Sequence, residues 1–383
     1  MKVHYITLWG ENSKDRKLGY SPAALTKSKY ILDKLKNNSN VDGLKIVSFS
    51  SGGRKFNGFY FPHTESWNKI PLWHCFTFGS NLLPLRIIER ILNKIQLFLY
   101  LLFAVKKDDI VIMYHERYFA SVRKLARLFA KRKIVLEIEE VYTIAADYSP
   151  KEIQKEIKGF SYADGYILIN NLIGDICLLD KNKPQIVLYG TYNVNHATVQ
   201  PKDDKMTHVV YAGTLNKRKY GAWLTAESAK YLPENYHVHI LGFGTPEEIA
   251  EFKEYVHNIS QIAEAKLTYD GVLKGNEYVR FMQKCQIGIS AQDADGLYNK
   301  TSFPSKILSY LSNGLNIVTI RLDVIEKSPL KDLITFFDNN KAIELAHSIL
   351  NAKLYDRQTL FDNLRDLDIK FQTDLSNLIN TIE

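Results

Sequence analysis

Apolar residues recur along the chain in two alternating patterns. Short continuous apolar runs such as Val3–Leu8 and Val209–Gly213 are typical of strands that helices cover on both faces. Between such runs, apolar residues spaced three and four apart, as in Ala23–Leu35, predict amphipathic helices. Polar or glycine-bearing loops separate the two kinds of segment. This alternation predicts an α/β protein built on doubly wound parallel sheets.

The N-terminal half carries the first series of elements. The predicted strands are Val3–Leu8, Leu44–Phe49, Asp109–Tyr114, Lys133–Ile138, Tyr166–Asn170 and Ile186–Leu188, and the predicted helices are Ala23–Leu35, Arg86–Val105 and Tyr118–Lys131. The stretch Ser50–Ser80 is rich in glycine and aromatic residues, and no periodicity assigns it an element. The polar stretch Thr191–Thr207 has no periodicity either, so we predict a domain boundary within it.

A second series of elements begins at His208. The predicted strands are Val209–Gly213, Val238–Leu241, Leu267–Gly271, Ile287–Ser290 and Ile317–Ile320, with helices Ala222–Tyr231, Pro246–Tyr255, Gly275–Lys284 and one between Pro304 and Gly314. Ligands of such sheets gather at the carboxyl ends of the strands. We predict an N-terminal domain over residues 1–195, a C-terminal domain over 196–350, and helices over 351–383 that return to the N-terminal domain.

The start of the last of these helices is a candidate anion site. Ser302 and Pro304 are start signals, because a serine side chain can cap free N–H groups and proline fits the first helical turn. Free N–H groups at a helix N-terminus, together with the charge of Lys306, would attract a phosphate. Gly314 suits the left-handed position after the helix. The alternative is a capped helix with a solvated lysine.

Composition narrows the class of protein. The chain has 383 residues, 45% of them hydrophobic, and a net charge of +8, which is compatible with nucleic acid, an anionic membrane surface or anionic small substrates. Cys75, Cys177 and Cys285 are too far apart for a disulfide framework and fit a reducing cytoplasm. The most apolar run, Leu97–Val105, is shorter than the roughly 20 residues that span a bilayer.

Two helical segments of the N-terminal half, Arg86–Lys107 and Arg117–Lys133, combine basic with apolar side chains. That combination fits contact with an anionic membrane surface. A solvated basic face is the alternative. Scattered positive charge without a helix-turn-helix, RRM or zinc spacing argues against nucleic acid as a partner.

Five motifs follow one another in the second half. They are Tyr-Ala-Gly-Thr-Leu from residue 211, a basic loop ending at residue 221, Leu-Gly-Phe-Gly from 241, Tyr-Asp-Gly-Val from 269 and Phe-Pro-Ser-Lys-Ile-Leu from 303. In this order they resemble the donor-binding half of GT-B glycosyltransferases, in particular the family-4-like enzymes of bacterial polysaccharide gene clusters. The resemblance covers Val209–Ile320 well and the N-terminal half in layout only. It implies two Rossmann-like domains that face a cleft, with a nucleotide sugar on the C-terminal domain and an acceptor on the other.

The resemblance also implies roles for individual residues. The implied diphosphate-binding residues are Lys217, Arg218, Lys219, Ser305 and Lys306, with Lys219 as the best match to the family's Lys-Gly pair. The implied nucleotide-binding residues are Gly213, Gly242, Gly244, Gly271, Val272 and Ser309. This chain departs from the family pattern at Thr301 and Ser309, where two glutamates are common, and at Thr214, where an arginine is usual. Asp293, Asp295 and Thr301 are the candidates for contact with the sugar.

On the acceptor side, the chemistry needs a group that takes a proton. Glu139 and Glu140 follow the predicted strand Lys133–Ile138, and His115 follows the strand before it. Strand alternation puts Glu137 and Glu139 on one face, and buried carboxylates require partners. We predict Glu139 or Glu140 as the acceptor-side carboxylate and His115 as a further catalytic candidate. A structural histidine is the alternative at residue 115.

The expectation is therefore an enzyme that transfers a sugar from a nucleoside-diphosphate sugar to a saccharide or lipid-linked saccharide acceptor in cell-surface polysaccharide synthesis, with retention. Asp293-Ala-Asp295 matches a metal-binding DxD only by its letters, so no metal and no cofactor beyond the donor are expected. The expected location is the cytoplasm, at the inner face of the membrane. The alternatives are a sugar-nucleotide epimerase or hydrolase of the same fold, and an inactive GT-B-like binding subunit.

Overall fold

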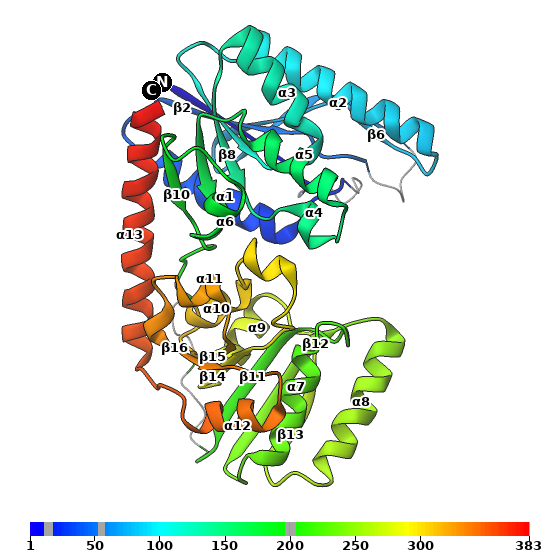
Figure 1. The fold of residues 1–383 in the computed structure, drawn as a ribbon, viewed down its shortest axis with the longest axis vertical. Coiled ribbons are helices and arrows are strands. Elements are labelled where there is room, and N and C mark those ends of the chain that lie inside the picture. Colours follow the sequence, from blue (N-terminus) through cyan, green and yellow to red (C-terminus); the bar gives the residue numbers. More distant parts are fainter. Residues whose placement is uncertain (11–17, 53–57, 196–198, 200–203, 383) are drawn as a thin grey trace. The chain divides into compact units, whose positions relative to one another are not determined.

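The computed structural model describes residues 1–10, 18–52, 58–195, 199 and 204–382, and the chain divides into two compact units. Unit 1 comprises Met1–Thr191 and Lys370–Glu383, and unit 2 comprises Tyr192–Ile369. Each unit is built around a largely parallel sheet flanked by helices (Figure 1). The chain is thus of the α/β class that the alternating pattern predicted.

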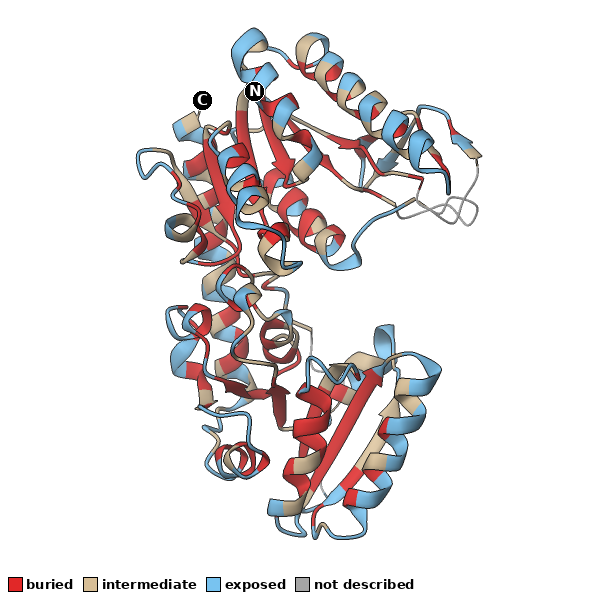
Figure 2. Cartoon of the chain, turned by 45° about the vertical axis from the view of Figure 1, so that its right-hand side comes forward, coloured by how far each residue is buried: buried red, intermediate tan, exposed pale blue. Residues whose placement is uncertain are grey.

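The sheet of unit 1 has the strand order β10-β9-β8-β7-β1-β2-β5-β4. Its strands are β1 (Lys2–Thr7), β2 (Gly43–Ser48), β4 (His63–Trp67), β5 (Ile70–His74), β7 (Ile110–Tyr114), β8 (Lys133–Ile138), β9 (Gly165–Leu168) and β10 (Gln185–Val187). Neighbouring strands are parallel except β4 and β5. The central strands are almost wholly buried (Figure 2), because helices cover both faces of the sheet.

The helices of unit 1 are α1 (Pro22–Lys36), α2 (Leu83–Phe103), α3 (Ala120–Leu125), α4 (Tyr142–Ala145), α5 (Pro150–Phe160) and α6 (Ile173–Ile176). Two parts differ from the sequence prediction. The unassigned stretch Ser50–Ser80 contains β4, β5 and an antiparallel pair, β3 (Gly58–Tyr60) with β6 (Thr77–Gly79). Tyr118–Lys131, predicted as one helix, is a 3-10 turn, α3 and a π turn in succession, and it ends at Lys131 in the left-handed region at φ 47°.

The sheet of unit 2 is wholly parallel, with the order β13-β12-β11-β14-β15-β16. Its strands are β11 (Thr207–Thr214), β12 (Tyr236–Phe243), β13 (Lys266–Gly271), β14 (Ile287–Ser290), β15 (Asn316–Ile320) and β16 (Ile334–Phe337). The five predicted strands are confirmed. The sequence prediction missed β16, a four-residue strand at the edge of the sheet with two half-buried residues.

The helices of unit 2 are α7 (Gly221–Ser228), α8 (Pro246–Ser260), α9 (Gly275–Met282), α10 (Ser305–Leu311), α11 (Asp323–Glu326), α12 (Ala342–Leu350) and the first part of α13 (Arg357–Ile382). The helices predicted over residues 351–383 are one continuous helix, α13, since no glycine or proline interrupts it. From Lys370 onward α13 belongs to unit 1, where Phe371 stacks on Tyr30 with ring centroids 5.8 Å apart.

Helix α10 begins at Ser305, and its position is fixed by packing. Pro304 is the N-cap residue and no side chain caps the helix, so the predicted Ser302 cap is wrong; the Ser302 hydroxyl donates to the Tyr298 carbonyl at 2.8 Å instead. The buried Tyr310 hydroxyl donates to the Ile289 carbonyl and accepts from the Ala212 N–H, both at 3.0 Å. Gly314 is in the left-handed region at φ +76°, as predicted.

Candidate active site

In unit 2, the strand order reverses between β11 and β14. The chain runs from β11 to β12 on one side, and β14 pairs with β11 on the other side. Open α/β sheets bind ligands in the crevice outside the carboxyl ends of the strands at such a switch point. In this chain, the loops at residues 215–220 and 291–304 follow these strand ends. They contain six of the fourteen donor-site candidates, namely Lys217, Arg218, Lys219, Asp293, Asp295 and Thr301.

Lys306 and Lys219 converge at this switch point. The Lys306 side chain passes over Gly213, where a Cβ would lie 2.8 Å from Lys306 Cε, so that a side chain at residue 213 would displace the end of Lys306. Its Nζ lies 5.1 Å from the centroid of the Tyr211 ring. Burial and, secondly, the charge of Lys219 lower the pKa of Lys306 to about 8. Among the described residues neither side chain has an ion-pair partner, so an anion between them would relieve their repulsion.

The two other basic residues of the loop take different directions. Lys217 pairs with Glu251 on α8, and its Nζ lies 4.9 Å from the centroid of the Trp223 ring. The structure therefore does not bring Lys217 to Lys306. The charge of Arg218 acts instead on Tyr298, whose pKa is raised by burial and by Asp293 and lowered by Arg218. Arg218 thus lies near the loop that follows β14.

A close backbone approach joins the basic loop to the loop after β14. At Gly221, the first residue of α7, a Cβ would lie 2.2 Å from the Ala291 carbonyl oxygen, so that only glycine permits this contact. Tyr220, just before it, is in the left-handed region at φ 55°. Packing at Gly221 therefore holds the carboxyl ends of β11 and β14 together.

The acidic candidates Asp293 and Asp295 form a turn. The Asp295 N–H donates to Asp293 Oδ1 at 3.1 Å, and the Asn299 amide donates to the Asp293 carbonyl at 2.8 Å. Asp293 is half-buried and Asp295 is exposed. Thr301 is fully buried, and its hydroxyl has no hydrogen-bond partner among the described residues. Thr301 thus lies below the protein surface.

Ser309 and Ser305 lie along α10. The Ser309 hydroxyl is 3.1 Å from the Tyr278 hydroxyl on α9, and Ser305 is exposed at the first residue of the helix. Tyr278 was not predicted as a site residue, because no spacing links residue 278 to residue 309. A serine and a tyrosine hydroxyl together can bind another hydroxyl group, although without the charge of a carboxylate.

The four remaining nucleotide-site candidates differ in their surroundings. A Cβ on Gly242 would lie 2.3 Å from Leu215 Cδ2, and one on Gly244 would lie 2.7 Å from Glu248 Oε2. Packing within unit 2 therefore accounts for both glycines. Gly271, at φ +78°, has open space around it, and the side chain of Val272 is exposed. These two residues remain accessible to a ligand.

In unit 1 the strand order reverses between β1 and β7, and carboxylates gather beside that point. Glu137, at the end of β8, is fully buried and accepts a hydrogen bond from the Tyr5 hydroxyl on β1. Glu139, two residues later, is half-buried and pairs with the buried Lys27 on α1. Burial, followed by the charge of Glu139, raises the pKa of Glu137 well above its usual range. Glu139 is therefore the carboxylate that pairs with Lys27.

His115 lies inside unit 1. Its ring is stacked on Tyr142 with centroids 5.1 Å apart and meets Phe160 edge-on at 4.7 Å. Its Nδ1 is hydrogen-bonded to the Glu140 carbonyl oxygen at 3.2 Å, and burial lowers its pKa to about 3. A neutral, fully buried imidazole has the properties of the structural histidine that was the alternative interpretation. The Glu140 side chain is half-buried, and its carbonyl group supports His115.

Lys27 was also not predicted as a site residue, although its position along the predicted helix indicates a buried ion pair. It lies three and four residues before Tyr30 and Ile31, on the buried side of α1. A lysine on the apolar face of a helix indicates an ion pair below the surface. That signal points toward the strand-end glutamates of the same domain.

No family model matches the sequence, and no curated protein matches it significantly. Solved structures match over the whole chain. A lipopolysaccharide outer core galactosyltransferase, WaaB, in its apo form matches with a TM-score of 0.69 at 14% identity, covering 100% of this chain and 99% of the other. An α,α-trehalose-phosphate synthase (UDP-forming) from Burkholderia xenovorans, in complex with glucose-6-phosphate, matches with a TM-score of 0.66 at 9% identity, covering 100% of both chains.

A third match is the E. coli trehalose-6-phosphate structure bound with UDP-2-fluoro glucose, with a TM-score of 0.68 at 11% identity, covering 99% of each chain. At such low identities the likeness establishes the fold and leaves the chemistry to the residues described above. The fold is that of these proteins from end to end, in both units.

Proposed function

We propose that this chain, which has the GT-B fold, is a glycosyltransferase that uses a nucleoside-diphosphate sugar. The reaction breaks the bond between the sugar's anomeric carbon and the diphosphate, and it forms a new bond from that carbon to an acceptor hydroxyl. The proposed acceptor is a saccharide or lipid-linked saccharide of cell-surface polysaccharide synthesis, and the proposed stereochemical outcome is retention. No metal and no further cofactor belongs to this proposal.

One observation carries the proposal: Lys306 and Lys219 converge at the β11–β14 switch point without an ion-pair partner among the described residues. Two neighbouring cations, one half-buried and one exposed, form a site for a dianion. The same pair would stabilise the negative charge that develops on the departing nucleoside diphosphate. Gly213 supports this role, since it leaves the path of Lys306 open.

The rest of the donor site is proposed around this pair. Ser305 adjoins Lys306 at the start of α10 and is exposed, so we assign it to the phosphates as well. Gly271 and Val272 are assigned to the base, and Ser309 with Tyr278 to the ribose. Arg218 and the Asp293–Asp295 turn are assigned to the sugar side.

On the acceptor side we assign the proton-accepting role to Glu139. Its side chain follows the end of β8 and pairs with Lys27, which positions a carboxylate that could take a proton from an acceptor hydroxyl. The solved structures support the general substrate class, because one of them holds UDP-2-fluoro glucose and another holds glucose-6-phosphate.

A thermal-shift panel with UDP, GDP, ADP and dTDP tests the donor site. At least one nucleoside diphosphate should raise the melting temperature of the wild-type protein, and Lys306→Met should abolish that shift. Lys217→Met is the matched control, because Lys217 lies in the basic loop but pairs with Glu251. Absence of a shift with all four compounds, or an equal loss in the control variant, would contradict the proposal.

A catalytically inactive binding subunit is the second candidate. It is favoured by one observation: the two positions where family members commonly carry glutamates hold a buried threonine, Thr301, and a serine paired with Tyr278. Such a subunit would give the same thermal shift but no turnover. NMR of the donor with and without added acceptor distinguishes a transferase, a binding subunit and an epimerase. A transferase consumes the donor only when acceptor is present, and a binding subunit leaves the donor unchanged. An epimerase interconverts the sugars without acceptor.

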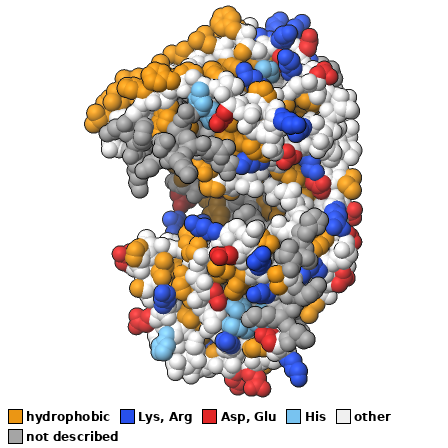
Figure 3. Space-filling view, turned by 180° about the vertical axis from the view of Figure 1, so that it is seen from behind, with side chains coloured by type: hydrophobic (Ala, Val, Ile, Leu, Met, Phe, Trp, Pro, Cys, Tyr) orange, Lys and Arg blue, Asp and Glu red, His pale blue; other side chains and the backbone are white. Residues whose placement is uncertain are grey.

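We also propose that unit 1 contacts an anionic membrane surface through α2. This helix has inverted amphipathicity: it buries Glu89 and Asn93, which hydrogen-bond to each other at 2.6 Å, and exposes apolar residues. The exposed side chains are Leu83, Ile87, Ile88, Ile91, Ile95, Leu99 and Phe103, with exposed fractions from 45% to 78%. Figure 3 shows hydrophobic side chains gathered along this edge of the molecule. Such a continuous apolar band marks an interaction surface.

The basic residues beside this apolar band favour an anionic membrane surface as its binding partner. The half-buried Arg86, Arg90 and Lys94 follow one another along α2 beside the apolar residues. A helix with apolar and basic sides binds in the interface of a bilayer that contains anionic lipids. Within the described part of the chain, no helix has both the length and the apolar character needed to cross a bilayer. The proposal is therefore contact with the surface, at the cytoplasmic side of the membrane.

Flotation with lipid vesicles tests this contact. The protein should float with vesicles that contain phosphatidylglycerol, less with pure phosphatidylcholine, and less at high salt. Ile91→Glu should reduce flotation at least tenfold. Ile262→Glu is the control, since Ile262 is similarly exposed in unit 2. A wild-type protein that stays in solution, and forms a dimer that Ile91→Glu disrupts, would assign the band to a second copy of the chain instead.

A further inference from the structure

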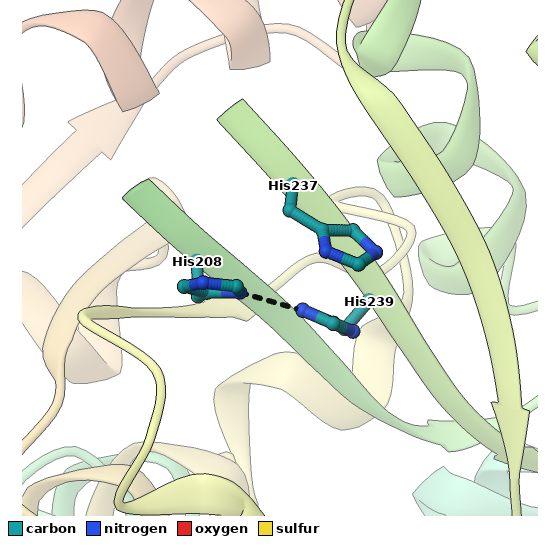
Figure 4. A group of neighbouring side chains, drawn as sticks. All are labelled: His208, His237 and His239. Atoms are coloured by element: carbon teal, nitrogen blue, oxygen red, sulfur yellow. Dashed lines mark hydrogen bonds between the residues drawn. The ribbon is translucent and has the colours of Figure 1, made fainter. Parts of the chain in front are cut away.

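Three buried histidines meet at the amino ends of two neighbouring strands. His208 is the second residue of β11, and His237 and His239 lie near the start of β12. His208 and His237 are paired in the strand register, and His239 follows two residues later on the same face of the sheet. Their rings turn toward one another (Figure 4), and the closest ring centroids, those of His237 and His239, are 3.7 Å apart. This end of the sheet is opposite to the switch-point site.

The outer nitrogens of two of these rings face carboxylates. His208 Nε2 lies 3.1 Å from both oxygens of Asp204, and His239 Nδ1 lies 3.0 Å from Asp270 Oδ2. An ionised carboxylate only accepts hydrogen bonds, and a neutral imidazole carries one N–H. Hydrogen bonds to Asp204 and Asp270 therefore place the ring protons on the outer nitrogens of His208 and His239.

The inner nitrogens of the same two rings then face each other as lone pairs. His208 Nδ1 and His239 Nε2 are 2.9 Å apart. Two lone pairs at that distance repel unless a positive charge lies between or beside them. A third ring, His237, stands next to them with its Nε2 held by the Thr268 hydroxyl at 3.0 Å. One nitrogen from each of the three rings lies within 4.8 Å of those of the others.

We propose that His208, His237 and His239 bind a divalent cation of the zinc class at the amino ends of β11 and β12. Tetrahedral zinc with bonds of about 2.0–2.1 Å sets its ligand nitrogens roughly 3.4 Å apart. Small rotations of the three side chains bring their nitrogens to that spacing. Imidazole is a preferred ligand for Zn²⁺, Co²⁺, Ni²⁺ and Cu²⁺, and the site offers no thiolate to select a softer ion.

The surroundings match the outer shell of a metal site. In metal centres, a histidine ligand commonly donates its second N–H to a carboxylate, which fixes the ring and raises its basicity. Asp204 and Asp270 occupy that position on His208 and His239. The Thr268 hydroxyl donates to Asp270 at 2.9 Å, so β13 takes part as well. The two carboxylates also balance the charge of a divalent cation.

The role of the site is structural. It connects β11, β12 and β13 to Asp204, which precedes the first strand of the sheet. The donor residues lie at the carboxyl ends of the strands, so the metal has no part in the transfer of the sugar. Metal binding should therefore stabilise unit 2 and leave nucleoside diphosphate affinity unchanged.

The test is metal titration of the full chain, purified without a polyhistidine tag and dialysed against a chelator. Co²⁺ should bind at one equivalent per chain with the visible absorption bands of a tetrahedral site, and Zn²⁺ should displace it. Zn²⁺ should also raise the melting temperature. A wild-type protein that binds neither ion stoichiometrically would overturn the proposal and leave a proton-sharing histidine network in its place.

Variants assign the ligands. His239→Gln should abolish stoichiometric binding, and Asp204→Asn should weaken Zn²⁺ binding about 10- to 100-fold, as loss of an outer-shell partner does. Asp204 is more than a third exposed, so Asp204→Asn keeps the test valid if His239→Gln fails to fold. The control is His74→Gln, in the separate group His63, Glu65 and His74 of unit 1. Binding that persists in His239→Gln, stays unchanged in Asp204→Asn, or disappears in His74→Gln would overturn the assignment.

Discussion

The carboxyl edges of the two sheets differ in charge. Both sheets are largely parallel, and both reverse their strand order beside their first strand. In unit 1 the carboxyl ends of the strands bring the carboxylates Glu137 and Glu139 close to one lysine, Lys27. In unit 2 the strand ends bring together two lysines, Lys306 and Lys219, and no carboxylate pairs with either among the described residues. Two sheets of similar architecture thus present side chains of opposite charge at the carboxyl ends of their strands.

Burial acts on both edges with different results. It raises the pKa of Glu137 and lowers the pKa of Lys306 to about 8, since in each case the charged form loses solvent. At neutral pH Lys306 is still mostly charged, whereas Glu137 is held in its neutral form. A cationic edge suits the diphosphate of a donor. Two neighbouring carboxyl groups, those of Glu137 and Glu139, suit the hydroxyl groups of an acceptor.

The largest expected effect concerns catalysis at the unit 1 edge. Glu139→Gln should lower kcat by about 10²- to 10⁴-fold, because a general base contributes that much, and it should leave nucleoside diphosphate affinity unchanged. Release of nucleoside diphosphate measures kcat, and calorimetry measures affinity. Glu140→Gln is the control, since Glu140 is the neighbouring half-buried glutamate after β8. A larger loss in that control would move the assignment to Glu140.

The next effect concerns stability at the same edge. Lys27→Met should destabilise unit 1 by about 3–5 kcal/mol, because it leaves buried carboxylates without their cation. Lys370→Met is the comparison, since Lys370 pairs with Asp374 at the surface and should cost less than about 1 kcal/mol. Urea unfolding monitored by circular dichroism measures both. Equal losses would mean that the Lys27 pair contributes no more than a surface pair.

A smaller effect should appear in the pH dependence of the donor site. The pKa of Lys306 is lowered to about 8, so the protonated form that binds diphosphate disappears as the pH rises above that value. The dissociation constant should then rise by at most about tenfold per pH unit, since one proton is linked to binding. The terminal phosphate, with a second pKa near 6, is already ionised in this range.

Calorimetry from pH 7 to 9.5 measures this dependence. Lys306→Arg should bind with a flat profile, because guanidinium stays protonated throughout that range. An unchanged slope in Lys306→Arg would show that another group titrates. A flat wild-type profile would show that Lys306 does not touch the diphosphate.

The sequence determined those features of the protein that depend on residues close together along the chain. Apolar runs located the strands from β1 to β15 outside the aromatic stretch 50–80, since burial on both faces leaves a continuous signal. Gly314 was predicted in the left-handed region because that backbone conformation excludes most side chains. The resemblance that the strand-end motifs carry predicted the GT-B fold. The presence of Lys306 beside the β11 strand end follows from the same order.

The tertiary structure decided which side chains meet. Lys217, Arg218 and Lys219 are adjacent in sequence, and only packing turns Lys217 toward Glu251 on α8. Strand register alone brings His208 beside His237, which is far from it along the chain. The physical reason is that helical and strand periods act over a few residues, whereas side-chain contacts depend on pairing and packing between distant segments. The sequence therefore indicated the framework and the pair Lys219 and Lys306, and only the fold revealed the Lys27–Glu139 ion pair and the histidine cluster.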